Sequence, residues 1–171
     1  MQGKRIAELV EDGYEDLEFW YPYLRLKEAG AQVVSVGTGG TRYRGRHGLM
    51  VEPERSISGI NAGDFDAVLI PGGYAPDRLR RHRAVVDLVR AMNDRHGWVA
   101  FICHAGWVPV SAGTMAGQQL TSFFSIRDDL ENAGARWVDA PVVRDANLIS
   151  SRGPDDLPAF CRAVIDALSG S

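Results

Sequence analysis

The chain has 171 residues, of which 45% are apolar and 24% charged, and its formal net charge is −3. This length predicts one domain over residues 1–171, and the composition is typical of a globular protein. The slightly acidic balance disfavours nucleic acid as a partner, because nucleic-acid-binding domains are usually basic. Two cysteines are too few for a disulfide framework.

The start of the chain and its apolar segments indicate where it resides. Residues 1–16 carry charges where a signal peptide has an apolar run. No apolar run approaches the roughly 20 residues of a membrane-spanning helix. We therefore expect a cytoplasmic protein with no membrane partner.

Short apolar runs typical of parallel strands buried on both faces recur along the chain. They occupy residues 6–10, 32–36, 67–70 and 98–102. Weaker patterns predict a small hairpin over 42–51 and late strands, at a sheet edge, over 137–143 and 148–150.

Helical periodicity lies between these runs, at residues 17–24, 85–92, 126–133 and 157–168. In the first of these segments, Leu17, Trp20, Tyr21 and Leu24 have the spacing of one apolar helix face. Strands that alternate with helices predict right-handed crossovers. The expected fold is a three-layer α/β/α sandwich around a mostly parallel sheet.

Three of the predicted strands are followed by segments with chemically useful residues. These segments are Glu11–Glu18, Pro71–Gly73 and Cys103–Gly106. Ligands of open α/β sheets bind outside the carboxyl ends of the strands. We therefore expect the three segments to meet at one site.

Cys103 gives the sharpest signal, because it directly follows a buried strand and precedes small residues and a helix. This is the position of a nucleophile at a strand-to-helix elbow. The start of the helix is expected to lower the thiol pKa below its usual value of about 8.5. The alternative is that Cys103 is a small buried apolar residue, which is the role expected for Cys161 on the last helix.

Polar groups near Cys103 have both structural and chemical interpretations. His104 is a candidate general base or an exposed residue at a helix start. Glu15 and Glu18 share a helix face, and a buried Glu18 with a raised pKa can donate a hydrogen bond to a thiolate. The segment Pro71–Gly73 is either a simple turn or a loop whose glycine N–H groups form an oxyanion hole. The histidines lack the spacing of a metal site, so we expect no metal and no cofactor.

Several motifs occur in a familiar order over most of the chain. They are EDGYEDLEFWYPYLRLKEAG, GRHG, DAVLIPGGYAPDRLR, ICHAG, SIRDDLENAGARWVD and SSRGPDDLPAF. With these motifs, the chain resembles the PfpI family of intracellular cysteine peptidases, amidases and protein deglycases. The resemblance implies the amidotransferase-like variant of the flavodoxin-like fold.

The resemblance also implies roles for individual residues. Cys103 is the nucleophile, Glu18 the carboxyl group beside its sulfur, and His104 the neighbouring base. Asp77 matches an acidic residue that orients this histidine from an adjacent subunit. The backbone amides of Gly73 and His104 match the oxyanion hole. Three further residues are expected to line the substrate pocket: Glu15, Arg46 and Phe123.

The sequence departs from the family pattern near the nucleophile. Many members have Cys-His-Gly-Pro, whereas this chain has Cys-His-Ala-Gly-Trp. Pro109 then falls inside the next helix and is expected to distort its first turns. Phe123 stands where peptidase-like members have a tyrosine. These departures affect substrate choice and leave the pair of Cys103 and Glu18 intact.

The leading hypothesis is a cysteine-dependent hydrolase of the deglycase type that acts on methylglyoxal and its early protein adducts as a stress protein. One alternative is an intracellular peptidase or amidase with a Cys-His-Asp triad formed between subunits. Another is an oxidative-stress sensor without turnover. In each case the resemblance implies a homo-oligomer, either a dimer or a trimer of dimers.

Overall fold

The main sheet has seven strands in the order β10-β11-β7-β6-β1-β2-β5 in a computed structural model that describes residues 1–170. Only the edge strand β10 is antiparallel to its neighbour. The strands of this sheet are β1 (Arg5–Val10), β2 (Gln32–Gly37), β5 (Arg55–Ser56), β6 (Ala67–Ile70), β7 (Trp98–Ile102), β10 (Val142–Asp145) and β11 (Leu148–Ser151). The four strands predicted from apolar runs are therefore confirmed.

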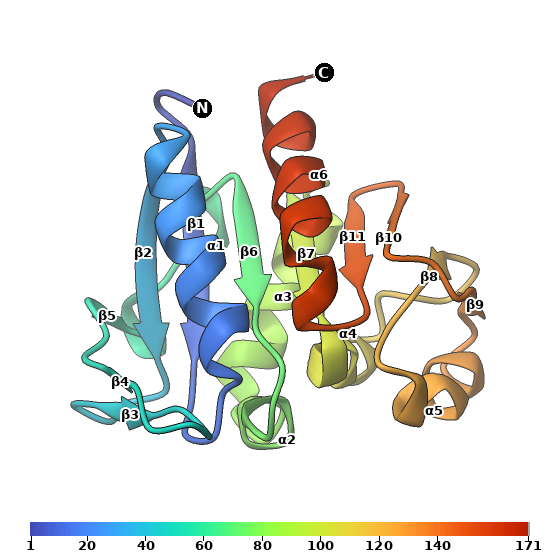
Figure 1. Ribbon diagram of the computed structural model, residues 1–171, viewed down its shortest axis with the longest axis horizontal. Coiled ribbons are helices and arrows are strands. Elements are labelled where there is room, and N and C mark those ends of the chain that lie inside the picture. The colour runs from blue at the N-terminus through green and yellow to red at the C-terminus, as the bar shows by residue number, and fades with distance from the viewer. Residues whose placement is uncertain (171) are drawn as a thin grey trace.

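Helices cover both faces of the sheet, which confirms the three layers. Figure 1 shows α1 (Asp16–Glu28) and α6 (Leu157–Ser169) in front of the sheet and α3 (Arg83–Asp94) behind it. The shorter helices are α2 (Ala75–Leu79), α4 (Trp107–Ala112) and α5 (Arg127–Asn132). Single 3-10 turns occupy residues 57–59, 62–64, 103–106, 124–126 and 154–156. Within residues 1–170, no helix is both long and apolar enough to cross a bilayer.

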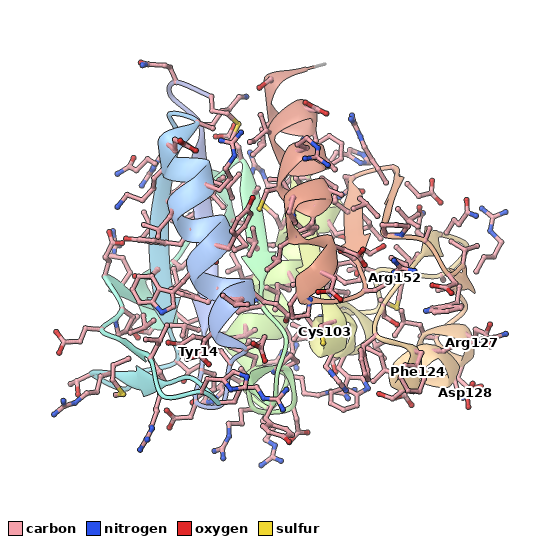
Figure 2. All side chains as sticks on the ribbon, viewed as in Figure 1. Tyr14, Cys103, Phe124, Arg127, Asp128 and Arg152 are labelled. Atoms are coloured by element: carbon pink, nitrogen blue, oxygen red, sulfur yellow. The ribbon has the colours of Figure 1, made fainter. Side chains whose placement is uncertain are left out.

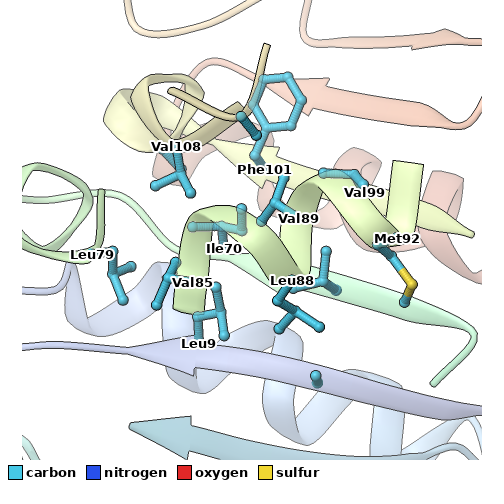
Figure 3. Packing of buried hydrophobic residues seen from close by; sticks show 14 of the residues in the cluster. Leu9, Ile70, Leu79, Val85, Leu88, Val89, Met92, Val99, Phe101 and Val108 are labelled. Carbon is cyan, nitrogen blue, oxygen red and sulfur yellow. The ribbon is translucent and has the colours of Figure 1, made fainter. Parts of the chain in front are cut away.

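Each face of the sheet has its own apolar core. Behind the sheet, Val85 and Val89 of α3 pack against Ile70 and Phe101 of the strands (Figure 3). In front of it, residues of α6 such as Phe160 pack over the other side chains of the same strands. Full burial of one such side chain stabilises the fold by about 1.5–3 kcal/mol, so the two cores hold the sheet rigidly under the loops at its ends.

Helix α1 buries a different face from the one predicted. Leu17 and Leu24 are 56% and 60% exposed, whereas Phe19 and Leu26 are fully buried. Both faces of this helix carry apolar residues, so periodicity alone did not identify the buried one. The buried face also carries Glu18, whose burial among apolar neighbours is as predicted.

The late strands also differ from the prediction. The segment 137–143 is not one strand: β9 (Arg136–Trp137) ends early and pairs with β8 (Gln119–Leu120), apart from the main sheet. Pro141, which has no N–H to donate to a ladder, lies just before β10. Strand β11 is interior, between β7 and β10. The hairpin predicted over 42–51 is confirmed as β3 (Tyr43–Arg44) and β4 (Met50–Val51).

The strand order reverses between β1 and β6, and the loops after these two strands are joined there. The chain adds β2 on one side of β1 and later adds β6 and β7 on the other. Tyr14 and Gly73 form an antiparallel bridge, and the Tyr74 N–H donates to the Gly13 carbonyl at 2.7 Å. A reversal of this kind leaves a crevice at the carboxyl ends of the strands.

Candidate active site

Cys103 lies in a strained turn at the end of β7. Its φ is +62°, in the left-handed region that residues other than glycine rarely adopt. The chain continues as a 3-10 turn over 103–106 before α4 begins at Trp107. Pro109 lies in the first turn of α4, where proline is tolerated, and the segment before α4 is a 3-10 turn. The turn directs the Cys103 side chain into the crevice, where it is 8% exposed.

Gly72 allows Cys103 and Glu18 to approach each other. The Gly72 N–H donates to Oε2 of Glu18 at 2.8 Å. A Cβ atom at Gly72 would lie 2.4 Å from that oxygen and 2.6 Å from the Cβ of Cys103. Only glycine fits between the two side chains. The loop after β6 is therefore packed between the helix that carries the carboxyl group and the turn that carries the thiol.

The pKa of Cys103 is shifted in the direction opposite to the prediction. Burial and the negative charge of an ionised Glu18 raise the thiol pKa to about 12, although the backbone amides of Gly73 and His104 lower it. The predicted effect of a helix start is weak, because an irregular turn and a helix of only six residues follow Cys103.

Glu18 carries a proton at neutral pH, as predicted for a buried carboxyl group. It is fully buried, and burial raises its pKa from 4.5 to about 8. Its Oε1 has no hydrogen-bond partner among residues 1–170. At pH 7 the negative charge that opposes a Cys103 thiolate is therefore mostly absent. The sulfur and the carboxyl group lie close enough for the charge of one to affect the titration of the other.

His104 faces the sulfur despite being the next residue in the chain. Its Nδ1 lies 3.2 Å from the Cys103 Sγ. The imidazole ring stacks on Phe123, with centroids 4.9 Å apart and an interplanar angle of 27°. Burial and the positive charge of Arg46 lower the pKa of His104. The ring is therefore neutral at pH 7 and has a lone pair to accept a proton.

A pocket of about 350 Å³ opens beside Cys103. It brings together most of the predicted residues: Glu15, Glu18, Arg46, Cys103, His104 and Phe123. Its other wall is residues 152–156, between β11 and α6, and sequence reasoning did not assign this wall to the site. Figure 2 shows Cys103 and Arg152 beyond the ends of the strands. The position of this loop could have identified it, because it follows the carboxyl end of β11, which is a parallel strand like β7.

The two arginines of the pocket are already paired. Arg46 lies 3.4 Å from Glu15 and over the ring of Tyr74. Arg152 binds Asp156 through two nitrogens and Asp139 through a third. Asp155 lines the same pocket and forms no ion pair with any described residue. The pocket therefore offers little free positive charge to an anion.

Asp77 is not brought to the Cys103 pocket. It pairs with Arg81 one turn along the chain, at the surface. It lines a second cavity of about 500 Å³, which reaches His104 from the other side and is also lined by Trp107. Within the described part of the chain, no carboxylate forms an ion pair with the His104 ring.

Ser125 was also missed by sequence reasoning. Its hydroxyl oxygen lies 3.2 Å from Nε2 of His104, on the side of the ring opposite Cys103. The 3-10 turn over 124–126 places it there. Ser125 does not directly follow a predicted strand, so no sequence pattern identifies it as a residue of the site. Cys161, by contrast, is buried in the front core as predicted.

Comparison with known proteins shows the family of the chain. Residues 4–167 match the DJ-1/PfpI family. The chain is 40% identical over 164 residues to Deglycase PfpI of Pyrococcus furiosus, covering 96% of this chain and 99% of the relative. It is 41% identical over 166 residues to the Putative cysteine protease YraA of Bacillus subtilis, covering 96% and 98%.

A solved structure supports the same assignment. A two-domain protein of Anabaena variabilis, with DJ-1/ThiJ/PfpI-like and ferritin-like domains, superposes with a TM-score of 0.95 at 39% identity. The match covers 97% of this chain and 48% of that one, so this chain spans about half of the two-domain protein. On sequence and fold, the chain belongs to the DJ-1/PfpI family.

Proposed function

We propose that this chain is a cysteine-dependent hydrolase of the deglycase type, active on small reactive carbonyls such as methylglyoxal and on their early protein adducts. The arrangement around Cys103 carries the proposal. A carboxyl group, an imidazole nitrogen and two backbone amides surround the sulfur. The relatives named as deglycases and as a putative cysteine protease support the same class of chemistry.

The first step is attack of sulfur on a carbonyl carbon. Nδ1 of His104, 3.2 Å from Sγ, accepts the thiol proton. Sγ then bonds to the carbon, and the electron pair of the C=O bond moves to the oxygen. The backbone amides of Gly73 and His104, which already face the sulfur, donate to this oxyanion. The imidazolium or the neutral Glu18 then returns a proton to the oxygen.

The pocket supports a small and uncharged substrate. Its volume of about 350 Å³ lies near the lower end of ligand sites. Both of its arginines are engaged by carboxylates, so an anionic substrate finds no free cation. Methylglyoxal and the carbonyl carbons of its adducts satisfy these conditions. We place the activity in the cytoplasm and in a homo-oligomer.

The test compares the two cysteines of the chain. Release of lactate from methylglyoxal is followed for the unmodified chain, Cys103→Ala and Cys161→Ser. We expect Cys103→Ala to abolish turnover and Cys161→Ser to retain it, since Cys161 lies in the front core. Turnover that persists in Cys103→Ala overturns the proposal. Accumulation of sulfinate on Cys103 at low peroxide, without turnover, would indicate a sensor instead.

Peptide hydrolysis is the second candidate, favoured by the cavity that joins Asp77 to His104. In this mechanism, Asp77 of a second copy orients the imidazole ring of the first. The mechanism requires Asp77 to break its ion pair with Arg81. Hydrolysis of a fluorogenic peptide that is lost in Asp77→Asn and restored by mixing Asp77→Asn with Cys103→Ala would establish it. Without restoration on mixing, the triad between subunits is excluded.

A further inference from the structure

Four residues of the same chain contact the partly exposed ring of His104. Nδ1 faces the sulfur of Cys103, and Nε2 faces the hydroxyl of Ser125, each at 3.2 Å. Phe123 stacks on one ring face, and Trp107 lies 5.4 Å away at an angle of 60°. A ring clamped in this way has a defined orientation before any second subunit arrives.

We propose that Ser125 is a positioning residue that fixes the tautomer of His104, with its hydroxyl oxygen accepting the Nε2–H so that Nδ1 stays unprotonated toward Cys103. This inference rests on the proposed role of His104 as the base. It assigns to a residue of the same chain the orienting function that the family resemblance assigns to Asp77 of a partner. Asp77 is engaged by Arg81 instead.

The chemistry requires one particular tautomer. A neutral imidazole carries a single N–H, and the partner of one nitrogen decides which nitrogen bears it. With the proton on Nε2, the lone pair of Nδ1 accepts the thiol proton, so an S–H bond breaks and an N–H bond forms. The products are a thiolate and an imidazolium whose two N–H groups donate to sulfur and to Ser125. Hydrogen bonds from the charged ring are stronger than those from the neutral one.

The local structure ties Ser125 to the turn that carries the nucleophile. The Phe123 N–H donates to the carbonyl of Cys103 at 3.2 Å, and the Ile126 N–H donates to the carbonyl of Phe123 at 3.2 Å. The Ile126 side chain is buried against the rear core. Ser125 therefore sits on a short loop that is anchored on both sides, with its hydroxyl at the solvent-facing edge of the ring.

The test uses Ser125→Ala, Ser125→Thr and Asp77→Asn in the full chain with methylglyoxal as substrate. We expect Ser125→Ala to lower kcat by about three- to tenfold, which corresponds to the free energy of one hydrogen bond, with KM unchanged. Threonine keeps the hydroxyl and should restore kcat, whereas Asp77→Asn tests whether a carboxylate of a partner orients the ring instead. Ser122→Ala is the loop control, because Ser122 bonds to Phe123 and Trp137 rather than to His104.

A second readout does not depend on turnover. The ¹⁵N spectrum of His104 should show the Nε2–H tautomer in the unmodified chain and a mixture of tautomers in Ser125→Ala. An unchanged tautomer and kcat in Ser125→Ala, together with loss of activity in Asp77→Asn, would overturn the inference in favour of a partner carboxylate. Turnover in Cys103→Ala would instead overturn the proposed function, so the two failures are distinguishable.

Discussion

A single buried proton links stability to chemistry at Glu18. Its carboxyl group is fully buried and accepts a hydrogen bond from the Gly72 N–H. The folded chain keeps this proton up to a pKa of about 8, whereas an unfolded chain releases it near 4.5. Between these values the folded state binds more protons than the unfolded state, so this group makes stability fall as pH rises.

Glu18→Gln should remove this dependence. From about pH 5 to pH 8 we expect the free energy of unfolding to fall less steeply than in the unmodified chain, by about 1.4 kcal/mol per pH unit. Urea unfolding at several pH values measures the slope. Glu28→Gln is the control, since Glu28 is on the same helix but exposed. The same Glu18→Gln variant should also turn over more slowly, because the amide removes one of the two groups that can return a proton to the oxyanion. Parallel slopes for the two variants would contradict the protonation state assigned to Glu18.

Glu8 is also a fully buried carboxyl group, and no catalytic step uses it. It lies in β1, an interior strand of the sheet between β6 and β2, and neither of its oxygens has a hydrogen-bond partner among the described residues. Burial raises its pKa well above 4.5, which keeps the group neutral. An unpartnered polar group in a core costs free energy.

Glu8→Met should therefore stabilise the chain. We expect the free energy of unfolding to rise by about 1–3 kcal/mol at pH 7, because an apolar side chain of similar length replaces an unsatisfied one. Chemical denaturation measures the change. Glu8→Gln is the matched comparison and should give no such gain, since its amide is also unsatisfied. A Glu8→Met chain that is less stable would show that the carboxyl group has a partner.

At the scale of elements, the loop between β6 and α2 joins the helix α1 to the turn after β7. Gly72 lies where a Cβ atom would meet both Glu18 and Cys103. Gly73, with φ +76°, presents its amide to the sulfur. The loop therefore sets the distance between the carboxyl group of Glu18 and the thiol of Cys103.

Gly72→Ala should separate these groups. We expect kcat for methylglyoxal to fall about a hundredfold, as for a displacement of about 1 Å at a reacting group, and stability to fall by about 1–3 kcal/mol from overpacking. Gly59→Ala is the control, since a Cβ there meets only the end of the Arg55 side chain. Steady-state kinetics and thermal unfolding test both effects. Equal kcat values for the two alanine variants would contradict the tight packing at Gly72.

At the scale of the whole molecule, the pocket is assembled from loops that follow β1, β7 and β11 and from the β3–β4 hairpin. Its charges therefore come from distant parts of the chain. The pairing of Arg46 and Arg152 with carboxylates leaves Asp155 as an uncompensated charge. This negative charge should make the pocket bind neutral aldehydes better than anionic ones.

Methylglyoxal and glyoxylate test this balance, because both present an aldehyde and only the second is an anion. We expect kcat/KM to favour methylglyoxal, and Asp155→Asn to reduce the preference by about two- to fivefold, the range for an exposed charge. Asp128→Asn is the control, since Asp128 lies on α5 outside the pocket (Figure 2). An unchanged preference in Asp155→Asn would remove Asp155 from substrate selection.

Local patterns in the sequence determined the layers and the centre of the site. Apolar runs placed β1, β2, β6 and β7, because strands buried on both faces need continuous apolar sequence. The position of Cys103 directly after β7 predicted the turn. The burial of Glu18 followed from its apolar neighbours. The motif order predicted the family before any geometry was known.

Only the tertiary structure decided which face of α1 is buried, which carboxylates engage the arginines, and how Cys103 titrates. Both faces of α1 carry apolar residues, so the choice depends on how the helix packs against the sheet. Arg46 and Glu15, or His104 and Ser125, are far apart in sequence and meet through loops. The thiol pKa depends on burial and on a carboxyl group 85 positions away, and neither leaves a periodic signal along the chain.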